Sequence, residues 1–153
     1  MYATIVVGTD GSPTASEAVT RAAELAVQSG AKLVIVSAYR PVDRARLEAE
    51  RASAPADIAY VINPEEDVAA HLEAATELAN AAGVAEVRTL PVDAAPAEAL
   101  LDAAEQVGAD LIVVGSQGMA GAKRFLLGSV PNRISHHAPC DVLIVKTDHV
   151  LTR

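Results

Sequence analysis

Apolar residues gather along the chain in five short runs, and each run is a candidate β-strand. The runs are Thr4 to Val7, Lys32 to Ala38, Glu86 to Leu90, Asp110 to Val114 and Asp141 to Lys146. Four of them are nearly continuous in aliphatic side chains, which is typical of strands covered on both faces in a parallel sheet. The stretch from Val84 to Val92 alternates more between apolar and polar residues, so we expect the third strand to lie at an edge.

Segments rich in Ala and Glu, with apolar residues at helical spacing, separate these runs. The predicted helices are Thr14 to Ser29, Glu65 to Ala82, Pro96 to Val107 and Ser129 to Ala138. In the second helix, we expect Val68, Leu72, Ala75 and Leu78 to form the buried stripe. Strand and helix therefore alternate, which predicts one α/β domain over residues 1–153 with an open parallel sheet and right-handed crossovers.

One segment, residues 40–63, does not fit this alternation. It is longer than most connections between a strand and a helix, and prolines interrupt it. A partly helical flap and a flexible, variable insertion both agree with its composition.

The overall composition narrows the class of protein. Hydrophobic residues make up 51% of the 153 residues and aromatic residues 3%, so the core must be built from Val, Ile, Leu and Ala. The formal net charge of −8 argues against general nucleic-acid binding, which depends on clusters of Lys and Arg. No stretch approaches the roughly 18 apolar residues of a membrane span, and the first residues do not resemble a signal peptide. We therefore expect a cytoplasmic protein that binds neither nucleic acid nor membrane.

Cys140 is the single cysteine, so an internal disulfide is impossible, as expected in a reducing compartment. A small buried residue before the last strand and a reactive thiol are the two interpretations of this cysteine. We favour the first, because free cysteine is among the most commonly buried residues.

The chain lacks acidic residues over one long stretch. From Leu111 to Cys140 there is no Asp or Glu, although the whole chain contains 20. The basic and histidine residues of the same stretch are Lys123, Arg124, Arg133, His136 and His137. A locally basic loop in an acidic protein is what an anion site needs. Side chains that only face solvent are the alternative.

Glycines mark the connection after the fourth strand. Gly115 and Gly118 allow a sharp turn and a close approach of the backbone to a ligand. Gly128 precedes Ser129, which is a candidate helix N-cap, and the start of a helix is a ready site for a phosphate. The spacing is neither that of a Walker A loop nor that of a G-x-G-x-x-G dinucleotide loop. A phosphate site and an ordinary strand-to-helix turn both remain open.

The spacing G-x2-G-x9-G-S, together with the start TIVVGTDGSPTASEAV and the ending HHAPCDVLIV, resembles the nucleotide-binding universal stress proteins. The resemblance covers the chain except residues 40–63. It implies a Rossmann-like sheet of the adenine nucleotide alpha hydrolase type, with five parallel strands in the order 3-2-1-4-5 and helices on both faces. It also implies an adenine nucleotide, usually ATP but AMP or cyclic AMP in some members, between the ends of the first and fourth strands.

The resemblance assigns roles to particular residues of this chain. Around the ribose and phosphates it places Gly115, Gly118, Gly128, Ser129 and Val130. Along the adenosine it places Gly8, Thr9, Asp10 and Ala38. It further implies a homodimer through the last strand, Val142 to Lys146, and an unidentified protein partner that reads the nucleotide-bound surface. The chain departs from the family pattern at Gln117 and in the loop Asp93-Ala94-Ala95-Pro96, which lacks a glycine before its proline. We expect these departures to weaken or reshape the contacts to phosphate and base without abolishing the site.

The same residues offer little for catalysis. Asp10 is the only acid in the two glycine-containing loops, so we expect any Mg²⁺ to be carried by the phosphates and no metal to be held by the protein. Ser129 has no evident base beside it, and His71 and His149 look like surface residues. The sequence therefore favours a regulatory binding protein without catalytic residues. A slow ATPase at the same site and a nucleotide-free interaction module are the alternatives.

Overall fold

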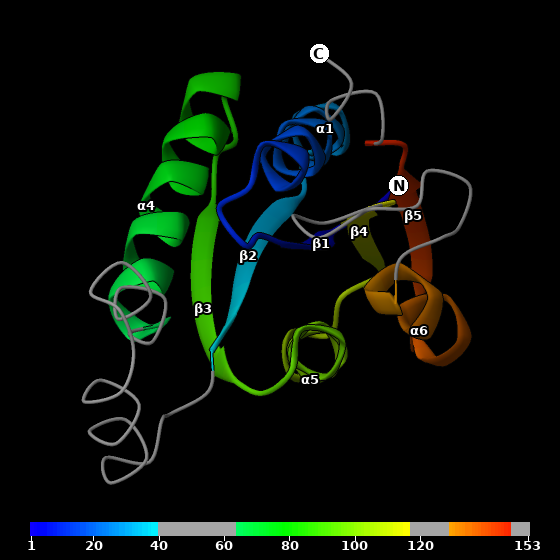
Figure 1. Cartoon of the computed structure of the whole chain (residues 1–153). Helices are drawn as coiled ribbons and strands as arrows, with labels where there is room; N and C mark the ends of the chain where they lie inside the picture. The colour runs from blue at the N-terminus through cyan, green and yellow to red at the C-terminus, as the bar shows by residue number, and fades with distance from the viewer. Residues whose placement is uncertain (40–63, 117–128, 148–153) are drawn as a thin grey trace, which may run out of the picture.

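The computed structural model describes residues 1–39, 64–116 and 129–147, and these form a five-stranded parallel sheet with helices on both faces (Figure 1). The strands are β1 (Thr4–Gly8), β2 (Lys32–Tyr39), β3 (Val87–Asp93), β4 (Leu111–Gly115) and β5 (Asp141–Val145). The helices are α1 (Pro13–Ser29), α4 (Pro64–Ala82), α5 (Pro96–Val107) and α6 (Ser129–His137). The sheet order is β3-β2-β1-β4-β5, which confirms the predicted fold class. The prediction for residues 40–63 lies outside the described residues.

The central strand β1 explains why the apolar runs are continuous. It pairs in parallel with β2 on one side and with β4 on the other. Ile5 and Val7 pack into the core under α1 and α4, whereas Val6 packs into the core under α5 and α6, and all three side chains are 0% exposed. A strand whose two faces are both covered needs apolar side chains at every position.

Capping residues set the ends of α1 and α5: the predicted stops at Gly30 and Gly108 are confirmed, and α1 starts at Pro13, one residue before the predicted Thr14. Ser12 precedes α1, and its hydroxyl accepts a hydrogen bond from the backbone N–H of Ala15 at 3.2 Å. Gly30 and Gly108 follow α1 and α5 with φ of 67° and 64°, so each ends its helix in the left-handed conformation that favours glycine.

Strand β3 is longer than predicted, because it continues through Pro91 to Asp93. Proline cannot donate a hydrogen bond, but at the edge of a sheet one side of the strand needs no partner. The predicted edge position is confirmed, since β3 pairs with β2 alone among the described strands and its side chains alternate in exposure.

The predicted stripe of α4 is wrong at its last position. Val68, Leu72 and Ala75 are buried, but Leu78 is 37% exposed and Ala79 is fully buried in its place. The stripe continues by four residues after Ala75, where the prediction assumed three, and the small Ala79 side chain lets α4 approach the core closely.

We expect a change in side-chain size to affect stability at the buried Ala79 and to have little effect at the exposed Leu78. Ala79→Leu should lower the free energy of unfolding by about 1–3 kcal/mol, because extra atoms in a filled core cause strain. Leu78→Ala, the matched control, should change it by less than about 0.5 kcal/mol. Urea unfolding followed by circular dichroism measures both, and equal losses would contradict the assignment of the buried stripe.

Candidate functional site

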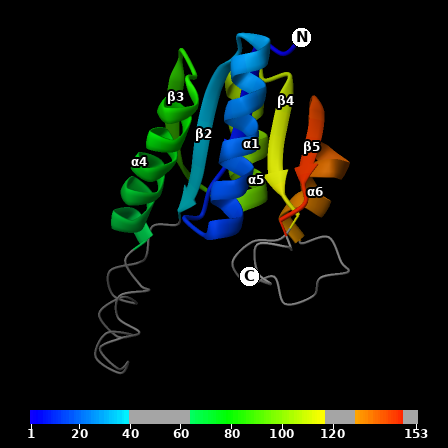
Figure 2. The same ribbon diagram turned by 90° about the horizontal axis from the view of Figure 1, so that it is seen from above.

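The carboxyl ends of the strands form the edge at which a ligand site is expected. Figure 2 shows the strands running in one direction, so that these ends share one side of the sheet. After β1 the chain enters α1 on one face, and the helix that leads into β5, α6, packs on the other. Neighbouring strands β1 and β4 therefore flank the point where the connections diverge, which is where open α/β sheets bind ligands.

Thr9 fixes the loop between β1 and α1 to the neighbouring strand. Its backbone N–H donates to the carbonyl of Val36 at 2.9 Å, and its carbonyl accepts from the hydroxyl of Ser37 at 2.9 Å. Its own hydroxyl oxygen accepts from the backbone N–H of Gly11 at 3.1 Å. Thr9 is buried, so these bonds satisfy its polar groups and hold the loop on the end of β2.

Asp10 is exposed, and Ser12 fixes the direction of its carboxylate. One oxygen, Oδ1, accepts hydrogen bonds from both the backbone N–H and the hydroxyl of Ser12. The other oxygen, Oδ2, accepts no hydrogen bond from the described residues. Ser12 is itself buried and lies 2.9 Å, between hydroxyl oxygens, from Thr14. The hydrogen bonds from Ser12 thus fix the orientation of the carboxylate through Oδ1.

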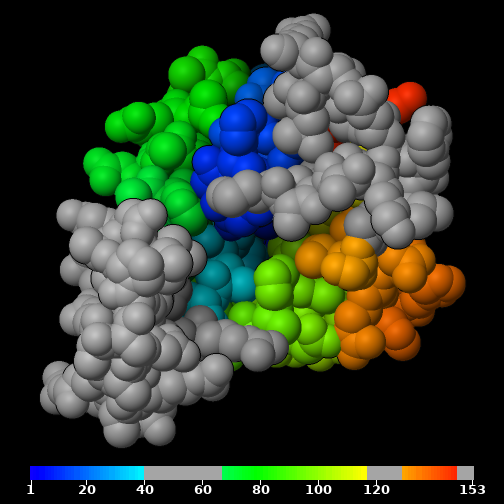
Figure 3. Space-filling view, viewed as in Figure 1, coloured from blue at the N-terminus to red at the C-terminus, as the bar shows by residue number. Residues whose placement is uncertain are grey.

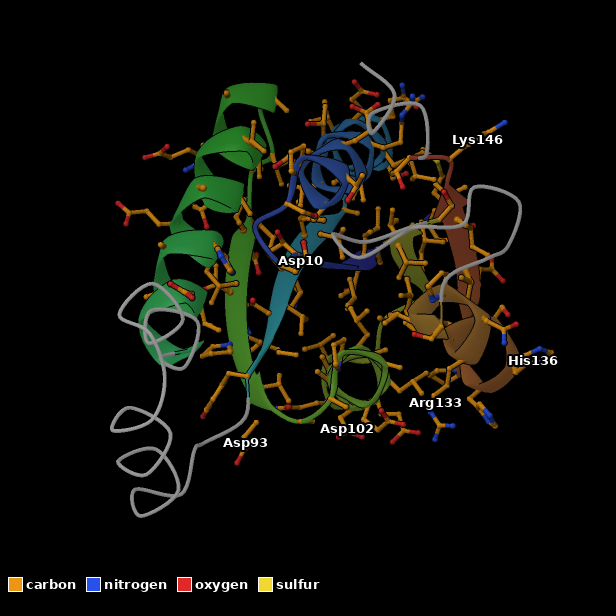
Figure 4. The ribbon with its side chains drawn as sticks, viewed as in Figure 1. Asp10, Asp93, Asp102, Arg133, His136 and Lys146 are labelled. Carbon is orange, nitrogen blue, oxygen red and sulfur yellow. The ribbon has the colours of Figure 1, made fainter. Side chains whose placement is uncertain are left out.

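Figure 4 shows that Asp10 lies in a different place from the other labelled charged residues. Asp10 lies near the centre of the view, between the helix layers that contain α1 and α5. The other labelled residues, which are Asp93, Asp102, Arg133, His136 and Lys146, lie toward the periphery. Among the labelled charges, Asp10 is therefore the one placed at the middle of the carboxyl edge.

Two small residues border Asp10 at the ends of β1 and β2. A methyl group on Gly8 would lie 3.1 Å from both terminal carbons of Leu100, so glycine allows α5 to pack closely on the end of β1. Ala38 is half-buried near the end of β2 and packs against the core under α5. Figure 3 shows atoms of β2 open to the viewer between those of α1 and α5. Both predicted residues therefore lie at the carboxyl edge.

The end of β4 is tied to the end of β5 beyond the last ladder pair. Gly115 pairs with Val145, and the backbone N–H of Ser116 donates to the Val145 carbonyl at 2.7 Å. The backbone N–H of Thr147 then donates to the Ser116 hydroxyl oxygen at 2.9 Å. These bonds fix the position from which the glycine-rich connection leaves the sheet. The sequence analysis missed both hydroxyl residues, because neither belongs to a spaced motif.

Helix α6 begins at Ser129, which is exposed, and continues through the half-buried Val130 and the buried Pro131. The predicted start of this helix at Ser129 is confirmed, and its end lies one residue before the predicted Ala138. The role of the Ser129 hydroxyl as a cap stays a prediction. Gly118 and Gly128 lie outside the described residues. Each described member of the predicted set lies at a strand end on the carboxyl edge or at the start of a helix there.

The described basic and histidine residues of the stretch without acids, Leu111 to Cys140, do not converge on this edge. The guanidinium of Arg133 forms an ion pair with the carboxylate of Glu98 on α5. His136 and His137 lie in the last turn of α6, far from its start. Lys123 and Arg124 lie outside the described residues.

His71 on α4 contacts the loop at this edge, although the sequence indicated only a surface residue. It is half-buried, and its ring lies against Gly11, which has a φ of +80°. A methyl group on Gly11 would overlap the Cδ2 and Nε2 atoms of that ring. Residues 60 positions apart meet here through packing of α4, so no local pattern could have shown the contact.

Cys140 lies at the opposite, amino edge of the sheet. An open hollow of about 650 Å³ there is lined by Tyr2, Asp110, Cys140 and Asp141, among others. Partial burial, with smaller effects from Asp141 and Asp110, raises the pKa of the Cys140 thiol. Because the thiolate is the reactive form, this environment favours a packing role for the half-buried cysteine.

The described residues, 1–39, 64–116 and 129–147, also bear on metal binding and membrane crossing. No group of three or more His, Cys, Asp and Glu residues there could hold a metal ion. None of the helices in those ranges combines the length and the apolar character that a membrane crossing requires.

The geometry defines a class of protein, namely an open α/β domain with its topological switch point between β1 and β4, the place where such sheets bind ligands. The family model described as the universal stress protein family matches residues 1–146, and the chain belongs to this family.

Similar proteins cover nearly the whole chain. Universal stress protein Rv1636 from Mycobacterium tuberculosis is 42% identical over 146 residues, which is 95% of this chain and 97% of that one. A putative universal stress protein of Staphylococcus haemolyticus, SH1215, is 33% identical and covers 97% of this chain and 87% of its own. The crystal structure of a universal stress protein in complex with cAMP superposes with a TM-score of 0.73 at 39% identity, covering 96% of this chain and 98% of the other.

The Ser12 hydroxyl is expected to stabilise the fold. Ser12→Ala removes the helix cap and leaves the buried hydroxyl of Thr14 without this partner, so the free energy of unfolding should fall by about 1–2 kcal/mol. Ser135→Ala, at an exposed position of α6, is the matched control and should change it by less than about 0.5 kcal/mol. Chemical denaturation measures both values. A Ser12 variant as stable as the Ser135 control would show that the hydrogen bonds of the Ser12 hydroxyl contribute nothing to the free energy of unfolding.

Proposed function

We propose that the protein binds an adenine nucleotide at the carboxyl edge of the sheet, between the ends of β1 and β4. The observation that carries the proposal is the oriented Asp10 carboxylate, whose Oδ2 stands ready to accept a hydrogen bond from a ribose hydroxyl or the base. The cAMP complex of a universal stress protein that is 39% identical supports this choice of ligand. Gly8, Thr9 and Ala38 would border the adenosine.

The phosphates would lie on the other side of the crevice. Gly115 ends β4 there, and Ser129 and Val130 start α6, whose first turn contains no acidic residue. Backbone N–H groups at a helix start and its positive dipole end favour a phosphate. Gly118 and Gly128 complete the proposed set of binding residues. These residues would make the same kinds of contact with ATP, AMP or cyclic AMP. Where ATP is the ligand, Mg²⁺ would come with its phosphates.

We assign the site to regulation by binding, with no catalytic residue. Asp10 has one oxygen engaged by Ser12 and, in this proposal, the other by the nucleoside, so it is not available as a general base. The ordered nucleotide-bound surface would then be recognised by a protein partner in the cytoplasm. The location follows from the single cysteine, since a chain without internal disulfides suits a reducing compartment.

The nucleotide proposal is tested by titration calorimetry with cyclic AMP, AMP and ATP, after any co-purified nucleotide has been removed. Asp10→Asn should weaken binding of the preferred nucleotide roughly tenfold, or by about 1.4 kcal/mol, because a hydrogen bond to a charged acceptor is lost. Asp93→Asn changes another carboxylate at the carboxyl edge, and its affinity should stay within about twofold of the parent. Absence of heat with all three nucleotides would refute the proposed function.

We also propose that the protein forms a homodimer through β5, within the predicted segment Val142 to Lys146. The outer edges of the sheet differ: β3 carries Arg88 and Pro91, which both discourage pairing with another strand. The interior of β5 contains only the half-buried residues Val142, Leu143 and Ile144. An apolar edge without such protection needs a cover, and a second β5 around a two-fold axis would provide it.

The two edges should respond differently to an added charge. Val142→Lys should convert the dimer to a monomer at micromolar concentration, because a lysine in the middle of the interface must be desolvated. Thr89→Lys places the same charge on the exposed β3 edge and should leave the assembly unchanged. Sedimentation velocity gives the masses, and circular dichroism checks that both variants fold. A parent protein that is monomeric would rule out this interface.

A further inference from the structure

The contact between Gly11 and His71 joins the proposed site to helix α4. Gly11 has a φ of +80°, a conformation that other residues rarely adopt. A methyl group on it would overlap the Cδ2 and Nε2 atoms of the His71 imidazole and lie 2.9 Å from the ring's Cγ. The ring therefore fills the space beside the Gly11 Cα atom. Backbone conformation and lack of space are two independent reasons for glycine at this position.

The ring rests on a part of α4 that is itself firmly packed. Val68 lies one turn before His71 and Leu72 follows it, and both are buried in the core shared with α1 and β2. The imidazole is therefore held by a helix that the core keeps in place. A movement of the loop toward the Cβ side of Gly11 would have to displace this ring.

Gly11 lies between the two residues on which the orientation of the carboxylate depends. Asp10 precedes it, Ser12 follows it, and the Gly11 backbone N–H donates to the Thr9 hydroxyl oxygen at 3.1 Å. A rotation of the backbone at Gly11 would turn the Ser12 N–H away from Asp10 Oδ1. Holding Gly11 in place thus holds the carboxylate in place.

We infer that His71 is a positioning residue of the nucleotide site: its ring packs on Gly11 and keeps the β1–α1 loop in the conformation that presents Asp10 to the ligand. This inference rests on the proposed nucleotide binding. It assigns His71 no contact with the nucleotide. It attributes the effect of the ring to preorganisation, which raises affinity by removing the cost of ordering a loop on binding.

The first experiment measures the affinity of the full chain for cyclic AMP and ATP by calorimetry. His71→Ala should weaken binding about 3- to 10-fold, since the loop must then be ordered at the expense of binding energy. His71→Phe keeps a planar ring at the same place and should restore the affinity to within about twofold. Glu73→Ala, an exposed change on the same helix, is the control and should have no effect. Unchanged affinity in His71→Ala, or no rescue by His71→Phe, would overturn the inference.

A double-mutant cycle tests the contact without a ligand. Gly11→Ala should lower Tm at least twice as much in the parent chain as in a chain that already carries His71→Ala, because removal of the ring leaves only the backbone strain. Equal shifts in the two chains would show that the ring does not constrain Gly11. The outcomes separate the two proposals: if the parent binds no nucleotide, the proposed function fails, whereas a parent that binds as tightly as His71→Ala refutes the positioning role alone.

Discussion

Burial of β1 and β4 on both faces is the constraint from which the rest of the structure follows. The side chains of Val6, Val7, Ile112 and Val113 are fully buried, with the α1 layer on one side and the α5 layer on the other. No polar side chain fits along these strands, because an unpaired buried polar group is costly. Polar chemistry is therefore confined to the strand ends, where loops and helix starts supply it.

The polar residues at the carboxyl edge stabilise the fold and shape the site with the same bonds. Ser12 caps α1 and also orients Asp10, while Ser37 is buried within β2 and bonds to the carbonyl of Thr9. Removing either hydroxyl would affect the stability of the loop and the direction of its carboxylate together. In this protein, the hydrogen bonds that stabilise the start of α1 are therefore also those that orient the Asp10 carboxylate.

The sequence predicted those features that depend on local spacing. Continuous apolar runs located the strands, and proline and glycine located most helix ends, because these signals act within a few residues. The strand order came from the family resemblance and not from periodicity. Features that depend on tertiary packing were not predicted. Ala79, and not Leu78, belongs to the buried stripe of α4, and β3 continues through Pro91.

In the candidate site, too, the sequence indicated the local features but not the contacts that depend on tertiary packing. Glycine spacing and the TDGS sequence both pointed to the carboxyl edge, since glycine is needed by the backbone of a strand-to-helix turn. The link between Ser116 and Thr147 and the packing of His71 on Gly11 join residues far apart in sequence. Such contacts follow from how the helices dock on the sheet, so a single sequence carries no direct sign of them.

The structure also changes which groups could favour an anion at this edge. The sequence analysis relied partly on basic side chains after β4, but the charge of Arg133 is balanced by Glu98, and the two histidines of α6 lie at its far end. What the described residues offer a phosphate is the start of α6, with its backbone N–H groups and no acidic side chain in the first turn. In a chain of net charge −8, the absence of acids matters as much as the presence of donors, because a nearby carboxylate would cancel the weak field of a helix end. Attraction of this kind falls off within the first turn, so the position of the start of α6 at the carboxyl edge determines whether an anion could be held there.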